Sequence, residues 1–183
     1  MAGARRVSIA PVILIVGLAL VGSACSGMTP RERARESLRT GLAAHRDGGL
    51  EEAQGLYLET LGIESRNKYA LYNLGLIAHV RHQRVAAERA YRRALLVDPA
   101  FADALFNLAV LRSDLGATME AIDLYESVTV LEPRNAAAHL NLGLLLRSAG
   151  RPRVANEQIA RALDLNPDLA ASSQPAPEEP ESP

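Results

Sequence analysis

Apolar and small residues recur along this chain with a period of 34 residues. The clearest copy starts at Leu71, passes through Gly75, Ala87 and Tyr91, and ends at Pro99. The same skeleton returns twice further on, in the sets Leu105, Ala109, Ala121, Tyr125, Pro133 and His139, Gly143, Ala155, Ile159, Pro167. A fixed period of this length is typical of a solenoid, in which each repeat buries its apolar face against the next.

Within each period the apolar positions lie three or four residues apart, which predicts helices. Turn residues divide each period into two helices, at Asp47-Gly48-Gly49, 81–84, Gly116 and Gly150-Arg151-Pro152. Before the first helix, Thr29 and Glu32 form a predicted capping box around Pro30. We therefore expect an all-α chain of four helix pairs, over 34–67, 68–101, 102–135 and 136–169.

This arrangement resembles the tetratricopeptide repeat (TPR), a family with two antiparallel helices per repeat and a signature of Trp, Leu-Gly, Tyr, Ala-x3-Phe and Pro. Here Leu71, Leu105 and His139 stand in place of the Trp, and Tyr91 and Tyr125 in place of the Phe. The first repeat departs furthest from the signature, as terminal repeats usually do. The resemblance implies an α-solenoid wound as a right-handed superhelix, whose first helices line a concave groove for a protein or peptide.

The N-terminal segment 1–24 has the features of an export signal. Arg5-Arg6 precede an apolar run over 12–21, and Gly22-Ser23-Ala24 are small residues suited to cleavage. Cys25, the only cysteine, follows directly. This placement resembles the bacterial lipoprotein signal, in which such a cysteine is lipidated and becomes the first residue of the mature chain.

Two alternatives to lipidation at Cys25 remain open. Gly22 stands where lipoprotein signals prefer a larger aliphatic residue, so ordinary cleavage after Ala24 would give a periplasmic protein. An uncleaved signal anchor would hold the chain in the inner membrane, with Cys25 as a small apolar residue. The lipoprotein interpretation predicts an exported protein anchored in the bacterial cell envelope, at the outer membrane where there are two membranes. The linker then covers 25–33.

The C-terminal segment 170–183 is rich in Pro and Glu, and we expect it to be a disordered tail. No further helix follows the last predicted one, over 152–165, to cover it. We expect that helix to leave an apolar face open for a partner or for self-association, made of Val154, Ile159, Ala162 and Leu163. The alternative is a loose cover by the tail or a neighbouring protein.

Asparagine occupies the sixth position of three successive repeats, at Asn73, Asn107 and Asn141. Asparagine is a poor helix former, so its recurrence inside predicted helices needs a reason. Its amide has a donor and an acceptor, which suits it to hold the backbone of an extended peptide. The alternatives are that these asparagines link adjacent helices, or recur through repeat duplication.

Aromatic and basic residues accompany the asparagines on the expected groove. Tyr69, Tyr72 and Phe106 would form an aromatic patch, of the kind that interfaces favour, although packing between repeats explains them equally. Further along the same helices, His79, Arg112 and Arg147 would give one edge of the groove a basic character suited to an acidic ligand.

The sequence holds little that indicates catalysis. His79 and His82 are three residues apart without a third ligand to complete a metal site, and one cysteine cannot build a cysteine-based zinc site. A net charge of −1 gives no field for nucleic acid. We predict a protein that is not an enzyme and needs no cofactor or metal.

The two resemblances together imply a function as an interaction module or scaffold at the envelope. Small lipid-anchored members of the family help to assemble pili, secretion pores or cell-wall machinery, and the same role is the expectation for this chain. One alternative is a recruiter or regulator of a peptidoglycan-acting enzyme. Another is a structural homo-oligomer.

Overall fold

The computed structural model describes residues 27–169, and within that range the chain forms eight α-helices and no strand. Their bounds are α1 Pro30–Arg46, α2 Leu50–Ile63, α3 Lys68–Val80, α4 Arg84–Val97, α5 Ala102–Asp114, α6 Thr118–Leu131, α7 Ala136–Ser148 and α8 Pro152–Leu165. The predicted all-α solenoid of helix pairs is confirmed. Cys25, the signal segment 1–24 and the tail 170–183 lie outside the described residues.

Helix ends follow the local sequence. The predicted capping box is present at the start of α1, where the Thr29 side chain accepts from the Glu32 amide and the Glu32 carboxylate accepts from the Thr29 amide. Asn67 and Asn135 cap α3 and α7 in the same way, by accepting from backbone amides three residues on. Each of these caps satisfies a donor that the helix start leaves without an intrahelical partner.

The turn inside each pair depends on one residue with positive φ. These residues are 34 apart, at Gly48 (φ 85°), His82 (58°), Gly116 (75°) and Gly150 (75°). Glycine adopts this left-handed conformation without a steric penalty, whereas an L side chain is disfavoured there. His82 is therefore the one strained copy of a turn that the other three repeats make with glycine.

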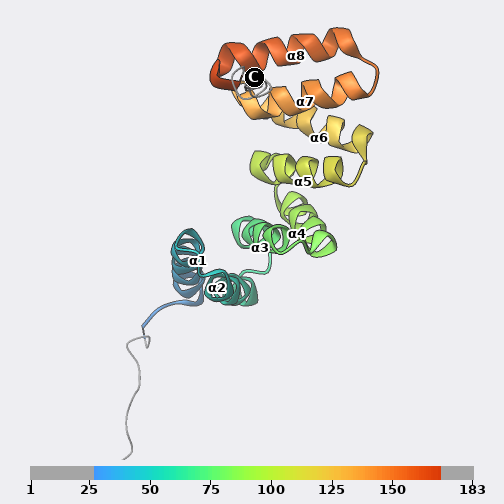
Figure 1. Ribbon diagram of the computed structural model, residues 1–183. Coiled ribbons are helices and arrows are strands. Elements are labelled where there is room, and N and C mark those ends of the chain that lie inside the picture. Colours follow the sequence, from blue (N-terminus) through green and yellow to red (C-terminus); the bar gives the residue numbers. More distant parts are fainter. Residues whose placement is uncertain (1–26, 170–183) are drawn as a thin grey trace, which may run out of the picture.

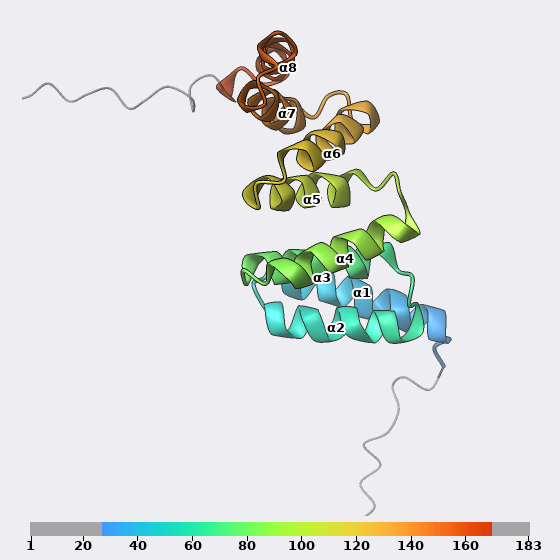
Figure 2. The same ribbon diagram turned by 90° about the vertical axis from the view of Figure 1, so that its right-hand side faces the viewer.

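The four pairs stack in chain order, with α1 and α8 at opposite ends of the array (Figures 1 and 2). Extensive packing joins each helix to its neighbours in the chain, within a pair and between successive pairs. Because distant repeats do not pack together, the fold presents two long faces. One is made by the first helices of the pairs (α1, α3, α5 and α7), and the other by the second helices (α2, α4, α6 and α8).

Small residues let the two helices of a pair approach closely. A methyl group added at Gly75 would lie 2.5 Å from Cε1 of Tyr91, and one at Gly143 would lie 2.6 Å from Cγ1 of Ile159. Gly41 faces Tyr57 in the same manner, at 2.9 Å. The glycine and the large side chain opposite it are thus one packing unit, repeated along the core.

The apolar face expected on α8 is only partly exposed, since Val154, Ile159 and Leu163 are half-buried. Ala162 is fully buried, Val154 packs against the core cluster of the last two repeats, and Ile159 reaches the backbone of Gly143. The residues of α8 that face solvent are mainly polar, among them Arg153, Asn156, Glu157, Arg161 and Asp164. This division of apolar and polar positions places mainly polar side chains of α8 at the end of the array, and self-association through the last repeat stays a prediction.

Among residues 27–169, none of the helices combines the length and the apolar character that crossing a membrane requires.

Candidate functional site

The three asparagines lie along the first-helix face, and each amide nitrogen is already engaged within the protein. Asn73 is buried and donates to the Tyr69 carbonyl oxygen at 2.8 Å. Asn107 donates to the Asp103 carbonyl at 2.9 Å and to the Tyr72 hydroxyl at 3.0 Å. The Tyr72 contact joins α5 to α3, so this amide does link neighbouring repeats.

Asn141 continues the pattern at the next junction, where its amide nitrogen donates to the Tyr125 hydroxyl at 3.1 Å. Within the described part of the chain, no group donates to the side-chain oxygens of Asn73, Asn107 or Asn141. Asn107 and Asn141 are partly exposed. What they can offer a ligand is therefore an acceptor for its N–H groups, and not the two-sided grip that the sequence suggests.

The aromatic residues divide between packing and exposure. Tyr72 lies 5.2 Å from Phe101 and 6.0 Å from Tyr91 between ring centroids, and Phe106 lies 5.4 Å from Tyr125. Both are partly buried between repeats. Tyr69 is exposed and meets Phe101 edge-on at 5.6 Å. Tyr69 is thus the aromatic side chain of the predicted patch that a ligand could cover most fully.

A row of aliphatic residues on this face was missed from the sequence. The ninth position of every repeat is aliphatic, at Leu42, Leu76, Val110 and Leu144. Leu42 and Leu144 are 45% and 41% exposed, and the middle two are partly exposed. The sequence shows this row as four large apolar residues spaced 34 apart, on the same helices that carry the framework residues of the repeats.

A hollow of about 200 Å³ opens on the first-helix face between α5 and α7. Its lining includes Asn141, Leu144 and Val110, together with the exposed carboxylate of Asp114. The Tyr125 hydroxyl also reaches this hollow. Burial raises the pKa of Tyr125 to about 12, so its phenol is neutral at physiological pH. The hollow combines an apolar wall, an acceptor and one negative charge.

The predicted basic edge is only partly present. Arg147 is exposed, and its guanidinium group forms no ion pair or hydrogen bond with a described residue. His79 is partly buried, with Nδ1 lying 3.4 Å from the Tyr91 hydroxyl, so its ring belongs to the packing of the second repeat. Arg112 lies in an ionic cluster between α4, α5 and α6, and the structure does not bring it together with the asparagines.

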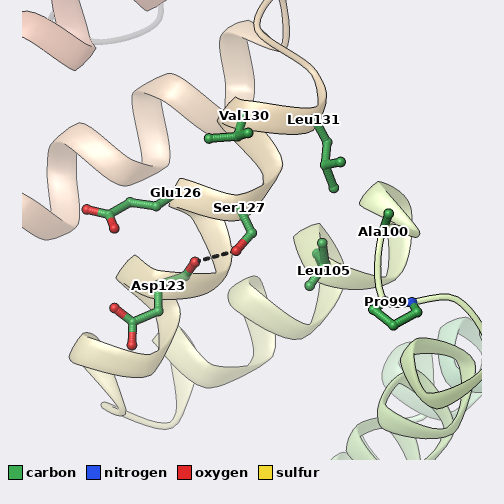
Figure 3. A pocket seen from close by; sticks show the side chains of 8 residues that line it. All are labelled: Pro99, Ala100, Leu105, Asp123, Glu126, Ser127, Val130 and Leu131. Carbon is green, nitrogen blue, oxygen red and sulfur yellow. Dashed lines mark hydrogen bonds between the residues drawn. The ribbon is translucent and has the colours of Figure 1, made fainter.

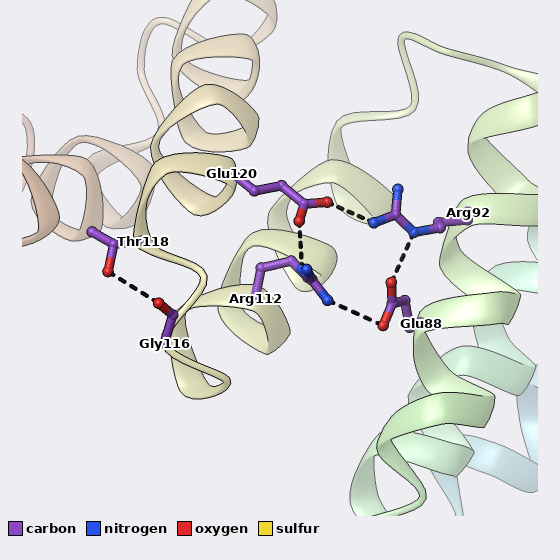
Figure 4. A network of polar contacts seen from close by, with 6 residues as sticks. All are labelled: Glu88, Arg92, Arg112, Gly116, Thr118 and Glu120. Carbon is purple, nitrogen blue, oxygen red and sulfur yellow. Dashed lines mark hydrogen bonds and ion pairs between the residues drawn. The ribbon is translucent and has the colours of Figure 1, made fainter.

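That cluster is a closed ring of alternating charges (Figure 4). Arg112 contacts Glu120 at 2.6 Å and Glu88 at 3.2 Å, and Arg92 contacts the same two carboxylates at 2.6 and 2.9 Å. Burial alone would raise the pKa of Glu120, but its hydrogen bonds with Arg92 and Arg112 outweigh burial and lower that pKa. The ring fastens the second repeat to the third.

Residues 27–169 contain no group of three or more His, Cys, Asp or Glu side chains placed to hold a metal ion.

The fold and this face define the class of protein, an α-solenoid of stacked helix pairs. Its family follows from the sequence match, since residues 90–123 and residues 111–170 each match a family model described as "Tetratricopeptide repeat". Residues 90–170 of the chain thus carry tetratricopeptide repeats. The match supports protein binding as the class of function, and the scaffold of tetratricopeptide repeats is generally non-catalytic. None of the curated proteins compared with the chain matches it significantly.

Solved structures share the fold. A structure titled "Crystal structure of MamA" superposes with a TM-score of 0.67 at 21% identity, covering 78% of this chain and 89% of that one. A second MamA structure gives 0.65 at 22% identity, covering 78% of both chains. A structure of Pseudomonas aeruginosa pilF gives 0.67 at 24% identity, covering 75% of this chain and 63% of that one. At these identities the likeness is one of fold.

Proposed function

We propose that the chain is a scaffold that binds an extended segment of another protein along its first-helix face. The observation that carries this proposal is the aliphatic row at Leu42, Leu76, Val110 and Leu144, which stays partly exposed beside the asparagines. Leu76 and Val110 also pack against the core, but Leu42 and Leu144 are exposed at the equivalent position, and packing alone does not account for large apolar residues there.

The face also indicates what such a segment would look like. Apolar side chains of the ligand would cover the aliphatic row and Tyr69, while its backbone N–H groups would donate to the side-chain oxygens of Asn107 and Asn141. A basic ligand residue would pair with Asp114 in the hollow, and an acidic group with Arg147 at the end of α7. The rigid helices hold these groups in place, so binding costs little ordering on the scaffold side.

We further propose that this scaffold works at the bacterial cell envelope, anchored by a lipidated Cys25. The support is the order of basic, apolar and small residues before the only cysteine. In such a position the scaffold would hold together parts of a pilus, secretion or cell-wall complex. Recruitment of a peptidoglycan-acting enzyme through the same face is the alternative.

The binding proposal is tested by paired substitutions at exposed positions on the two faces. Leu42→Gln with Leu144→Gln makes the first-helix face polar. The control pair, Leu58→Gln with Val85→Gln, alters residues that are 53% and 73% exposed on second helices. Peptides selected from a displayed random library against the unmodified chain are then titrated against both variants by fluorescence anisotropy.

We expect the first-helix pair to weaken peptide binding at least about tenfold, which is roughly 1.4 kcal/mol over two apolar contacts, and the control pair to leave it unchanged. Equal binding by all three proteins would overturn the assignment of the face. Circular dichroism of each variant checks that the helices are intact.

The anchor is tested separately by cell fractionation. With lipidation, Cys25→Ser moves the protein from the membrane fraction to the soluble fraction. Retention of the Ser variant in the membrane would show that an uncleaved signal anchor holds it instead.

A further inference from the structure

Two neighbouring pockets on the outer side of the array are copies of each other, one repeat apart. The first, of about 390 Å³, is lined by Ser65, Arg66, Leu71, Arg93, Leu96 and Val97. The second pocket has a volume of about 490 Å³ (Figure 3). Each residue that lines the first pocket has an equivalent 34 positions later in the lining of the second, for example Leu105 for Leu71 and Val130 for Leu96. Both lie between the join before a first helix and the last turns of the second helix.

The two pockets carry opposite charges. Arg66 and Arg93 border the first pocket, and the second has the neutral Ala100 and Ser127 at the equivalent positions. The second pocket is bordered instead by acidic side chains of α6, Asp123 and Glu126. We call the first the basic pocket and the second the acidic pocket.

None of these four charges is neutralised by another residue of the described range 27–169. The side chains of Arg66, Arg93, Asp123 and Glu126 form no ion pair or hydrogen bond with any other described residue. The ring around Arg112 pairs four other charges of the second and third repeats, whereas further exposed charges such as Arg84, Arg89 and Asp103 also form no ion pair in the described chain. The pockets are thus a place where the array leaves complementary charges unpaired.

Both pockets also expose apolar side chains. Val130 is 80% exposed and Leu96 is 77% exposed, the two highest values among the large hydrophobic residues of the described chain. Leu131 beside Val130 is 43% exposed. Two large apolar groups at equivalent positions of adjacent repeats, flanked by unpaired charges, have the composition of an interface centre with a polar rim.

We propose that a second copy of this chain covers these pockets, in a dimer with a twofold axis between the basic and the acidic pocket. A twofold axis places the basic pocket of each protomer opposite the acidic pocket of the other. Arg66 and Arg93 then meet the partner's Asp123 and the partner's Glu126, while Leu96 and Val130 pack together at the centre. The surface is self-complementary because the pocket of one repeat is basic and the equivalent pocket of the next repeat is acidic.

This dimer leaves the first-helix face free. The pockets are formed by α4, α6, the joins between repeats and the buried floor residues Leu71 and Leu105. The aliphatic row and Asn141 take no part in them. A dimer would therefore present two peptide-binding faces, and the inference does not rest on the proposed function.

Charge reversal tests the arrangement. Sedimentation equilibrium of the full-length chain, in a density-matched non-ionic detergent, gives the dimer dissociation constant. Arg93→Glu places like charges at both pocket contacts of the dimer, and so does Glu126→Arg. We expect each single variant to dimerise at least about tenfold more weakly than the unmodified chain. Arg153→Glu, an exposed arginine on α8, is the matched control and should change nothing.

Mixing the two single variants is the decisive measurement. In the mixed dimer, Glu at 93 faces Arg at 126 of the other chain, and the original Arg93 faces the original Glu126, so both contacts are attractive again. We expect the mixture to form a mixed dimer that is tighter than the homodimer of either variant alone. A monomer at every concentration of the unmodified chain would overturn the proposal. A dimer that withstands both reversals would also overturn it, since association would then use another surface.

Discussion

Gly75 of α3 and Tyr91 of α4 fit together so closely that the tyrosine ring occupies the space of a missing side chain. A methyl group at Gly75 would lie 2.5 Å from Cε1 and 2.6 Å from Cδ1 of Tyr91. The ring cannot move aside easily, because Tyr91 is fully buried and its hydroxyl lies 3.4 Å from Nδ1 of His79. The pair therefore sets the distance between the two helices of the second repeat.

Gly75→Ala should destabilise the protein. Overpacking costs about 1–3 kcal/mol, and the better helix propensity of alanine returns at most about 1 kcal/mol. Gly55→Ala is the matched control, since nothing lies within 4 Å of a methyl group there in the middle of α2. Urea denaturation should give a lower free energy of unfolding for Gly75→Ala and a higher one for Gly55→Ala. A stabilised Gly75→Ala protein would contradict the tight seam.

His82→Gly should stabilise the protein by about 1 kcal/mol. His82 holds a φ of 58°, a conformation that costs an L residue about this amount and that glycine adopts freely. Thermal unfolding should show a higher melting temperature for His82→Gly. The reverse change at the equivalent turn, Gly116→His, should lower it. A fall in both variants would mean that the imidazole makes a stabilising contact that outweighs its backbone strain.

Arg112→Ala should weaken the junction between the second and third repeats. The change removes two ion pairs and leaves Glu88 and Glu120 with only Arg92 between them. We expect a loss of about 1–2 kcal/mol in the free energy of unfolding at low salt, and a smaller loss at about 1 M salt because of screening. Arg39→Ala provides the comparison, since Arg39 is 72% exposed and pairs with Glu36 alone. Similar losses for both arginines would argue against a cooperative ring.

Stability should fall at alkaline pH as buried tyrosines ionise. Burial raises the pKa of Tyr57 and of Tyr125 to about 12, against about 10 in an unfolded chain. Their stabilising contribution is complete below about pH 10 and is lost as the pH rises towards 12, since the unfolded state then loses its protons first.

The expected loss is about 1 kcal/mol per tyrosine between about pH 9 and about pH 11. Urea denaturation of the unmodified protein and of Tyr57→Phe at the two values measures it. The phenylalanine variant should lose less stability over this interval, because it has one ionisable ring fewer. An identical loss in both proteins would mean that the Tyr57 pKa is not raised.

The sequence was sufficient to predict the fold, because the residues that helix packing requires recur at a fixed spacing. Gly75, Tyr91 and their counterparts must be small and large in alternation for the helices to pack, so they recur every 34 residues. The turn glycines recur for backbone reasons in the same way. Where His82 replaces a glycine, the periodicity of its neighbours still predicts the turn.

The site was less predictable, because the spacing of residues does not show how side chains pair. Asn107 is on the expected face, yet its amide nitrogen is used by the Tyr72 hydroxyl, which comes from a different repeat. Arg112 lies on the same helix, but its guanidinium pairs with Glu88 and Glu120, which come from the two helices on either side of it in the chain. Such contacts depend on the stacking angle between repeats, which the sequence period does not state.

The packing of each repeat on its adjacent repeats has a consequence for how the molecule comes apart. No distant repeat holds a terminal one in place, so the array can open from an end one pair at a time while the rest stays folded. The α7–α8 pair can detach with the loss of only its contacts to the third repeat, whereas the second repeat is held on both sides. A mechanical force on a bound partner would therefore unfold the end repeats one at a time, and the molecule would lengthen before the partner dissociated.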